Sequence, residues 1–154
     1  MRLDDARTMA EGLLAQHGLT AAGWRFEWDR LRSCLGTCSY RRRVITLSRP
    51  LTEAQPDEAR VRNTILHEIA HALVGPGHRH NWIWQTKARQ IGCDGERCSA
   101  GPELPTRWVG VCPTCGTRIG RHRLTTRVRL TGKCKCRPYA AQALLVWIDH
   151  GRTA

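Results

Sequence analysis

Two histidines and a glutamate on one predicted helix have the residue types and the spacing of a catalytic metal site. In the segment TILHEIAHALV, His67 and His71 are four residues apart, and Glu68 follows the first histidine. Four residues of helix rise about 6 Å and nearly complete a turn, so both imidazoles lie on one face and can share a zinc ion. Glu68 can then take a proton from a zinc-bound water and return it to a leaving amine. This is the HExxH pattern of zinc peptidases, and the alternative is a pair of surface histidines that bind no metal.

A catalytic zinc ion also needs a third protein ligand and an open position for water. His78 follows His71 by seven residues, which is one residue too long for the pattern HExxHxxGxxH. His80 follows His71 by nine residues and precedes Trp84 by four, so it would lie at the start of the next helix. The spacing leaves both histidines as candidates.

Two cysteine pairs near the C-terminus could hold a second, structural zinc ion. Two thiolates separated by two residues can bind one ion from a tight turn, as Cys112 and Cys115 would, and Gly116 gives this turn room. Cys134 and Cys136 supply two more thiolates after eighteen intervening residues, with one residue between them instead of the usual two. We predict a four-cysteine zinc ribbon.

The other four cysteines have simpler expectations. Cys93 and Cys98 form a wider pair that could replace one half of the ribbon site or bind nothing. We expect Cys34 and Cys38 to be small buried side chains, and neither needs to be a nucleophile. Because we find no export signal, metal ligands and buried thiols are expected in place of a disulfide framework.

The charge of the chain favours a polyanionic partner. It has 25 Lys and Arg against 13 Asp and Glu, with a net charge of +12 and a pI near 10.2. Phosphate contacts release counterions and need no particular sequence, so DNA is the expected partner. The first twenty residues mix acids and a histidine with the apolar positions, and nothing later approaches eighteen apolar residues. We therefore expect a cytoplasmic protein without a membrane segment.

Five arginines lie between the two predicted halves of the ribbon, and we expect them on one zinc-fixed hairpin that grips phosphates. They are Arg118, Arg121, Arg123, Arg127 and Arg129. Trp108 or Tyr139 could add base stacking if single strands are bound. The alternative is a solubilising edge, since basic side chains also protect exposed strands.

The elements that position the histidines can be read from the apolar spacing. Residues 3–18 predict an amphipathic helix that stops at Gly18. Residues 24–28 alternate aromatic and charged side chains as a half-buried strand does, and a β-branched strand follows around residues 44–47. A helix capped by Asp57 or a neighbour runs to the break at residues 75–77. A further helix begins near Asn81 and ends around residues 90–93.

The composition changes after Gly92, where six of the eight cysteines and several short β-prone pieces follow. These pieces are RWVGV, RVRL and LLVWI. We therefore predict an α+β fold with a domain boundary there. Residues 1–92 would form a small HExxH metallopeptidase domain, and residues 93–154 a zinc-ribbon-like, arginine-rich β subdomain.

Two segments, LGTCSYRRRVITLSRPL and TILHEIAHALVGPGHRHNWIW, resemble the SprT-like metallopeptidases of the DNA-dependent protease type. The shared features are a GxCxY segment, an IxLS strand, HExxH, and a histidine four residues before a bulky aromatic. They fall here on Gly36, Cys38, Tyr40, Ile45, Leu47, Ser48, His67, Glu68, His71, His80 and Trp84. The resemblance covers roughly residues 35–92 and favours His80 over His78, which would be a partner of a ligand or a loop residue.

The resemblance implies three histidine ligands, a general-base glutamate and a C-terminal zinc ribbon, hence one catalytic and one structural zinc ion. It leads us to expect a zinc metalloendopeptidase that cleaves DNA-bound or DNA-crosslinked proteins, with Glu68 activating a zinc-bound water. Two alternatives are a zinc peptidase that needs no DNA and a non-catalytic, zinc-stabilised nucleic-acid-binding protein.

Overall fold

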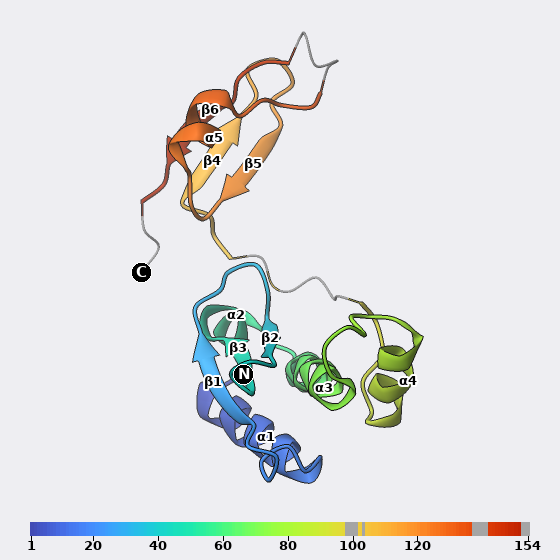
Figure 1. Cartoon of the computed structure of the whole chain (residues 1–154). Helices are drawn as coiled ribbons and strands as arrows, with labels where there is room; N and C mark the ends of the chain where they lie inside the picture. Colours follow the sequence, from blue (N-terminus) through green and yellow to red (C-terminus); the bar gives the residue numbers. More distant parts are fainter. Residues whose placement is uncertain (98–101, 103, 137–141, 152–154) are drawn as a thin grey trace. The chain divides into compact units, whose positions relative to one another are not determined.

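The computed structural model describes residues 1–97, 102, 104–136 and 142–151, and these fall into two compact units (Figure 1). The first unit comprises Met1–Leu104 and the second Pro105–Ala154. Helices and small sheets occur together in the chain, so the α+β class is confirmed. The units divide after Leu104, whereas the composition changes after Gly92.

The sheet of the first unit has three strands in the order β1-β3-β2. Strand β3 (Val44–Ser48) runs parallel to β1 (Arg25–Asp29) and antiparallel to β2 (Gly36–Ser39). All five residues of β3 are buried, as expected for a central strand that is covered on both faces. Strand β2 is therefore an edge strand, and it is the strand beside the candidate metal site.

In its described residues, the first unit also has four helices: α1 (Leu3–Gln16), α2 (Arg49–Ala54), α3 (Glu58–Val74) and α4 (Trp82–Gln90). Helix α3 packs against β2 and α1 as well as against α4 (Figure 1). The core between them is apolar and includes the buried side chains Ala10, Leu14, Phe26, Ile45, Leu47, Ile65, Leu66, Ile69 and Trp84. This packing gives α3, which carries the HExxH segment, a fixed place in the middle of the unit.

The ends of the helices follow local signals in the sequence. The Asp57 side chain accepts a hydrogen bond from the backbone N–H of Ala59 at 2.9 Å, which caps α3 as predicted. Helix α3 ends at Gly75, whose φ of 83° favours glycine. Asn81 caps α4 by accepting from the N–H groups of Ile83 and Trp84. The predicted helices and the strands of this unit are confirmed.

The second unit has an antiparallel sheet in the order β5-β4-β6 and one short helix. Its strands are β4 (Trp108–Val111), β5 (Arg118–Arg121) and β6 (Val146–Asp149), and its helix is α5 (Thr126–Thr131). Within the described residues, no helix is long and apolar enough to cross a membrane.

One expectation for this unit is wrong. The RVRL segment lies in α5 and not in a strand, so the five arginines do not share a hairpin. Thr125 caps the helix by accepting from the N–H of Val128 at 3.3 Å, and Gly132 follows its last residue. β-Propensity depends on a partner strand and a face to cover, and this segment has neither, so the local cap decides its structure.

Two apolar residues one turn apart on α3 test how this helix is held. Ile69 is fully buried, whereas Leu73 is 37% exposed although it continues the same apolar spacing. We expect Ile69→Ala to lower the free energy of unfolding by about 2–5 kcal/mol because it leaves a cavity, and Leu73→Ala by under about 1 kcal/mol. Denaturant unfolding followed by tryptophan fluorescence measures both, and equal losses would contradict this packing.

Candidate functional site

Three histidine side chains meet in the first unit. Helix α3 presents His67 and His71, and His80 comes from the turn before α4. The Nε2 atom of His80 lies 3.0 Å from Nε2 of His67 and 3.2 Å from Nε2 of His71. Zinc–nitrogen bonds of about 2.0–2.1 Å in a tetrahedron set the ligand nitrogens about 3.3 Å apart, so the three rings fit one ion. His78 belongs to no cluster of potential metal ligands among the residues that the structure describes.

Trp84 packs against the imidazole rings of all three histidines. Its indole is fully buried, with its ring centroid 4.5 Å from that of His67, 5.1 Å from His71 and 4.6 Å from His80. The Asn81 cap fixes the first turn of α4, so it fixes both Trp84 and the residue before the cap, which is His80. Trp84 therefore limits how the three imidazole rings can rotate.

The surroundings of the three rings keep them neutral near pH 7. Burial, then the neighbouring His71 and His80, lower the pKa of His67 to about 4. Burial and then His80 lower the pKa of His71 to about 4 as well. Burial, followed by the charge of Arg97, lowers the pKa of His80. A neutral imidazole has a free lone pair, so each ring can bind a metal ion.

Glu68 is buried beside the histidines, with only 7% of its surface exposed. Burial raises the pKa of its carboxyl to about 8. Gly36 of β2 allows this burial, since a Cβ at Gly36 would lie 3.0 Å from Cγ of Glu68 and 2.8 Å from Cγ2 of Thr64. A carboxyl that titrates near neutral pH can both accept and release a proton there.

The GxCxY segment presents its three residues to α3. Gly36 and Cys38 are two apart in β2 and share one face of the strand, and Tyr40 lies in the turn that follows Ser39. The Tyr40 hydroxyl lies 3.1 Å from the backbone carbonyls of both His71 and Gly75 and donates to this end of α3. Burial and then the Glu68 carboxylate raise the pKa of Cys38 to about 12, so its thiol stays protonated. The sequence marks these residues through the resemblance alone, and their contacts come from the fold.

Four cysteines meet in the second unit. The Sγ atoms of Cys112 and Cys136 are 3.9 Å apart, those of Cys115 and Cys134 are 3.6 Å apart, and all four lie within 4.8 Å of one another. Zinc–sulfur bonds of about 2.3 Å in a tetrahedron separate the sulfurs by about 3.8 Å, so the cluster is compatible with one zinc ion.

The turn between β4 and β5 favours thiolates. Gly116 has a φ of 72°, and its N–H donates to the carbonyl of Cys112 at 2.9 Å. Hydrogen bonds from the Thr117 hydroxyl and backbone lower the pKa of Cys115 to about 6. The backbone N–H of Cys115 likewise lowers the pKa of Cys112. The thiolate is the form that binds metal, so the turn is suited to a zinc ion before the ion arrives.

Of the other cysteines that the structure describes, Cys34, Cys38 and Cys93 take no part in these clusters. Cys93 is buried in the core of the first unit, and Cys98 lies outside the described residues. Cys34 is exposed, which corrects the expectation of a buried side chain, because it lies in the connection between β1 and β2. Its thiol donates to the carbonyl of Gly36 at 2.8 Å. Cys38 is partly buried.

All five arginines of the predicted grip are exposed, but they occupy different elements. Arg118 and Arg121 are the two ends of β5. They are three positions apart in a strand, so their side chains point to opposite faces. Arg123 follows β5, while Arg127 and Arg129 lie on α5. Of the five, Arg121 lines a pocket in this unit.

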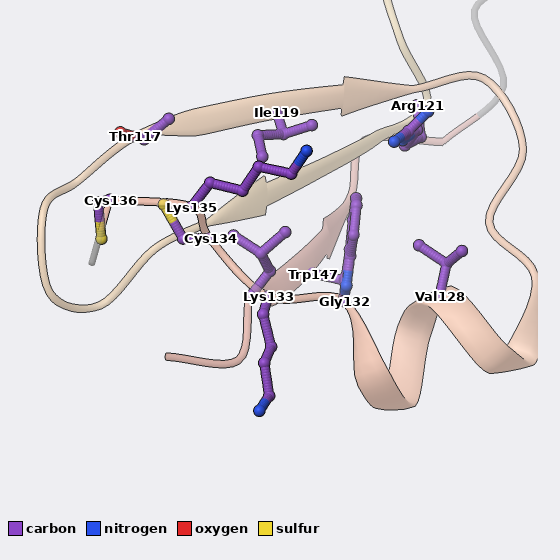
Figure 2. Close-up of a pocket in the computed structure, with 11 residues that line it drawn as sticks. Thr117, Ile119, Arg121, Val128, Gly132, Lys133, Cys134, Lys135, Cys136 and Trp147 are labelled. Carbon is purple, nitrogen blue, oxygen red and sulfur yellow. The ribbon is translucent and has the colours of Figure 1, made fainter. Parts of the chain in front are cut away.

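That pocket has a volume of about 360 Å³ and an apolar wall beside basic side chains (Figure 2). Its wall includes Trp147, Ile119 and Val128, and Lys133 and Lys135 line it together with Arg121. Gly110 is the partner of Trp147 across the sheet, and a Cβ there would lie 3.0 Å from the indole.

Trp147, Lys133 and Lys135 were not predicted from the sequence as neighbours of Arg121, because only the fold brings them together. Trp108, the aromatic expected to stack, has the Arg107 guanidinium 5.0 Å from its ring centre, and Tyr139 lies outside the described residues.

The chain thus has an α+β fold with a cluster of three histidines and a cluster of four cysteines, and both clusters are compatible with zinc. A model of the SprT-like family matches residues 8–107, about two thirds of the chain. The protein belongs to the SprT-like family, which suggests a domain of the zinc metallopeptidase type. No curated protein and no solved structure matches this chain.

The raised pKa of Glu68 predicts a pH-dependent effect on stability. The pKa of Glu68 is about 8 in the folded, metal-free protein and near 4.5 in an unfolded chain, so the stability that this carboxyl contributes is lost as the pH rises from 4.5 to 8. Glu68→Gln cannot ionise and escapes this loss. We expect its gain over wild type to increase by about 2 kcal/mol between pH 5.5 and pH 7.5.

Denaturant unfolding of the chelator-treated chains at the two pH values measures this gain. Glu58→Gln, at an exposed position in the first turn of the same helix, is the matched control substitution. An equal gain at both pH values for Glu68→Gln would show that its carboxyl titrates normally.

Proposed function

We propose that this protein is a zinc metalloendopeptidase that cleaves proteins bound or crosslinked to DNA. The observation that carries the proposal is the convergence of His67, His71 and His80 beside the buried Glu68 in a member of the SprT-like family. A helix that only packs has no need of three neutral imidazoles facing one another around a common point. Such a group is suited to a metal ion with one position left open for reaction.

The residues of the site would have separate roles in metal binding, ring positioning and proton transfer. His67, His71 and His80 would hold zinc through their Nε2 atoms, and Trp84 would keep the rings in place. Zinc, when bound, supplies a Lewis acid that polarises a scissile carbonyl and makes water more acidic. Glu68 would take the proton from the attacking water and deliver it to the leaving amine, which its pKa near neutrality favours. No covalent intermediate with the protein is required.

The cysteine cluster would hold a structural zinc ion. The buried core of the second unit is small and consists of Cys112, Cys134 and Leu145 among the described residues. Small modules of this kind gain about 10 kcal/mol or more of folding free energy from zinc. The four cysteines therefore supply stability that apolar burial cannot.

The second unit would bind DNA without regard to sequence. Support comes from the net charge of +12 and from the pocket in which Trp147 lies with Arg121, Lys133 and Lys135. An indole face stacks on any base, and cations beside it can contact the phosphates. Binding the enzyme and a DNA-bound substrate to one polymer raises their effective concentration, so cleavage need not depend on a tight peptide pocket.

The proposal is tested by incubating the zinc-loaded protein with a basic DNA-binding protein, with and without single-stranded DNA. We expect cleavage that increases at least about tenfold with DNA and that falls by at least about a hundredfold in Glu68→Gln, which lacks the general base. Gel electrophoresis of the products measures both effects.

The Arg121→Ala/Lys135→Ala variant separates DNA binding from chemistry. It should lose most of the stimulation by DNA and keep the basal cleavage, whereas the matched Arg7→Ala/Arg49→Ala variant, with two exposed cations removed from the first unit, should keep both. Cleavage that is indifferent to DNA would favour a general peptidase. No cleavage by fully metallated protein would favour a nucleic-acid-binding protein whose HExxH segment is structural.

A further inference from the structure

Two hydrogen bonds between Asn63 and Asp94 join the loop that follows α4 to α3. Asn63 donates from its side-chain amide to Oδ2 of Asp94 at 2.8 Å, and its amide oxygen accepts from the backbone N–H of Asp94 at 2.9 Å. The other carboxylate oxygen of Asp94 accepts from the backbone N–H of Glu96 at 2.8 Å. We call this arrangement of Asn63, Asp94 and the Glu96 backbone the clasp.

The clasp lies directly beside the first histidine. Asn63 precedes His67 by four residues on α3, so both side chains lie on one face of the helix. The backbone of Glu96 accepts a hydrogen bond from the His67 side chain, and the Asp94 carboxylate lies close enough to act on the charge of this ring. The Nε2 atom of His67 faces His80, so the bond to Glu96 uses the other ring nitrogen, Nδ1.

This geometry selects one tautomer. A neutral imidazole carries one proton, and an Nδ1–H that donates to a carbonyl leaves the lone pair on Nε2. Nε2 is the atom that points to the common centre of the three histidines. The hydrogen bond also fixes the rotation of the ring about the Cβ–Cγ bond, and a metal ligand needs a fixed ring orientation.

We propose that Asn63 and Asp94 are positioning residues that hold the Glu96 carbonyl against His67 and so preset this ring to bind the metal ion through Nε2. The proposal rests on the proposed function, because it assumes that the histidines bind zinc. Neither residue touches the metal or a substrate. Both act by keeping the loop of residues 93–97 on α3.

A swap of the two side chains separates this role from general packing. Asn63→Asp sets two carboxylates against each other and should open the clasp. The double variant Asn63→Asp/Asp94→Asn restores every bond, since the amide and the carboxylate only exchange sides. Glu11→Lys, which sets a like charge beside Arg7 on α1, is the control for electrostatic repulsion away from the site.

The measurement is titration of the full, metal-free chains with Co²⁺, read from visible absorption. The cysteine site gives intense sulfur-to-cobalt bands that a histidine site lacks, so the two sites are followed separately. We expect Asn63→Asp to weaken cobalt binding at the histidine site by 10- to 100-fold, the usual range for partners of metal ligands. The double variant should return to within about threefold of wild type, and Glu11→Lys should equal wild type.

Each other outcome has one meaning. If Asn63→Asp binds cobalt as wild type does, or if the double variant is not rescued, the positioning role is overturned. If Asn63→Asp fails to fold, Asn63→Ala removes the clasp without repulsion and must show the same weakening, and unchanged binding there again overturns the role. A wild-type chain that shows no histidine-site cobalt bands would instead overturn the proposed function.

Discussion

The close approach of strand β2 to helix α3 is the constraint on which the rest of the site depends. At Gly36 the strand lies so near the helix that even one methyl group would meet Thr64 and Glu68 at 3.0 Å or less. This contact removes water from Glu68 and brings its pKa near neutrality. Tyr40, in the turn directly after the strand, donates a hydrogen bond to the end of α3 at the carbonyls of His71 and Gly75. An edge strand and a helix thus fix Glu68 and His71 together.

The other side of α3 is held by different means and completes the site. Trp84 of α4 is buried against the three imidazoles, and the Asn81 cap sets both this indole and His80. Asn63 and Asp94 join α3 to the loop after α4. The three histidines therefore lie on elements with several independent supports, as a metal site requires if its geometry is to be set before an ion binds.

The sequence predicted those parts of the molecule that local spacing controls. The caps at Asp57 and Asn81 and the apolar spacing of α1 and α3 gave the helices. The spacing left both His78 and His80 open, the resemblance to the family favoured His80, and the structure brings His80 to the other two histidines. Helix formation and capping act over a few residues, so the sequence carries this information directly.

Parts that depend on distant contacts were not predictable in the same way. The RVRL segment has β-prone residues, but a strand needs a partner, and the Thr125 cap turned it into a helix. Trp147, Lys133 and Lys135 carry no motif that would join them to Arg121, because a sheet pairing and a loop bring them together. Asn63 and Asp94, 31 residues apart, are likewise connected only by the fold.

Anomalous diffraction at the zinc absorption edge can show whether His67, His71 and His80 hold a metal ion. Crystals of the zinc-loaded chain should show one peak within about 2.1 Å of the three Nε2 atoms and another about 2.3 Å from the four cysteine sulfurs. A histidine site without a peak in zinc-saturated crystals, or a peak that includes His78 in place of His80, would contradict the account.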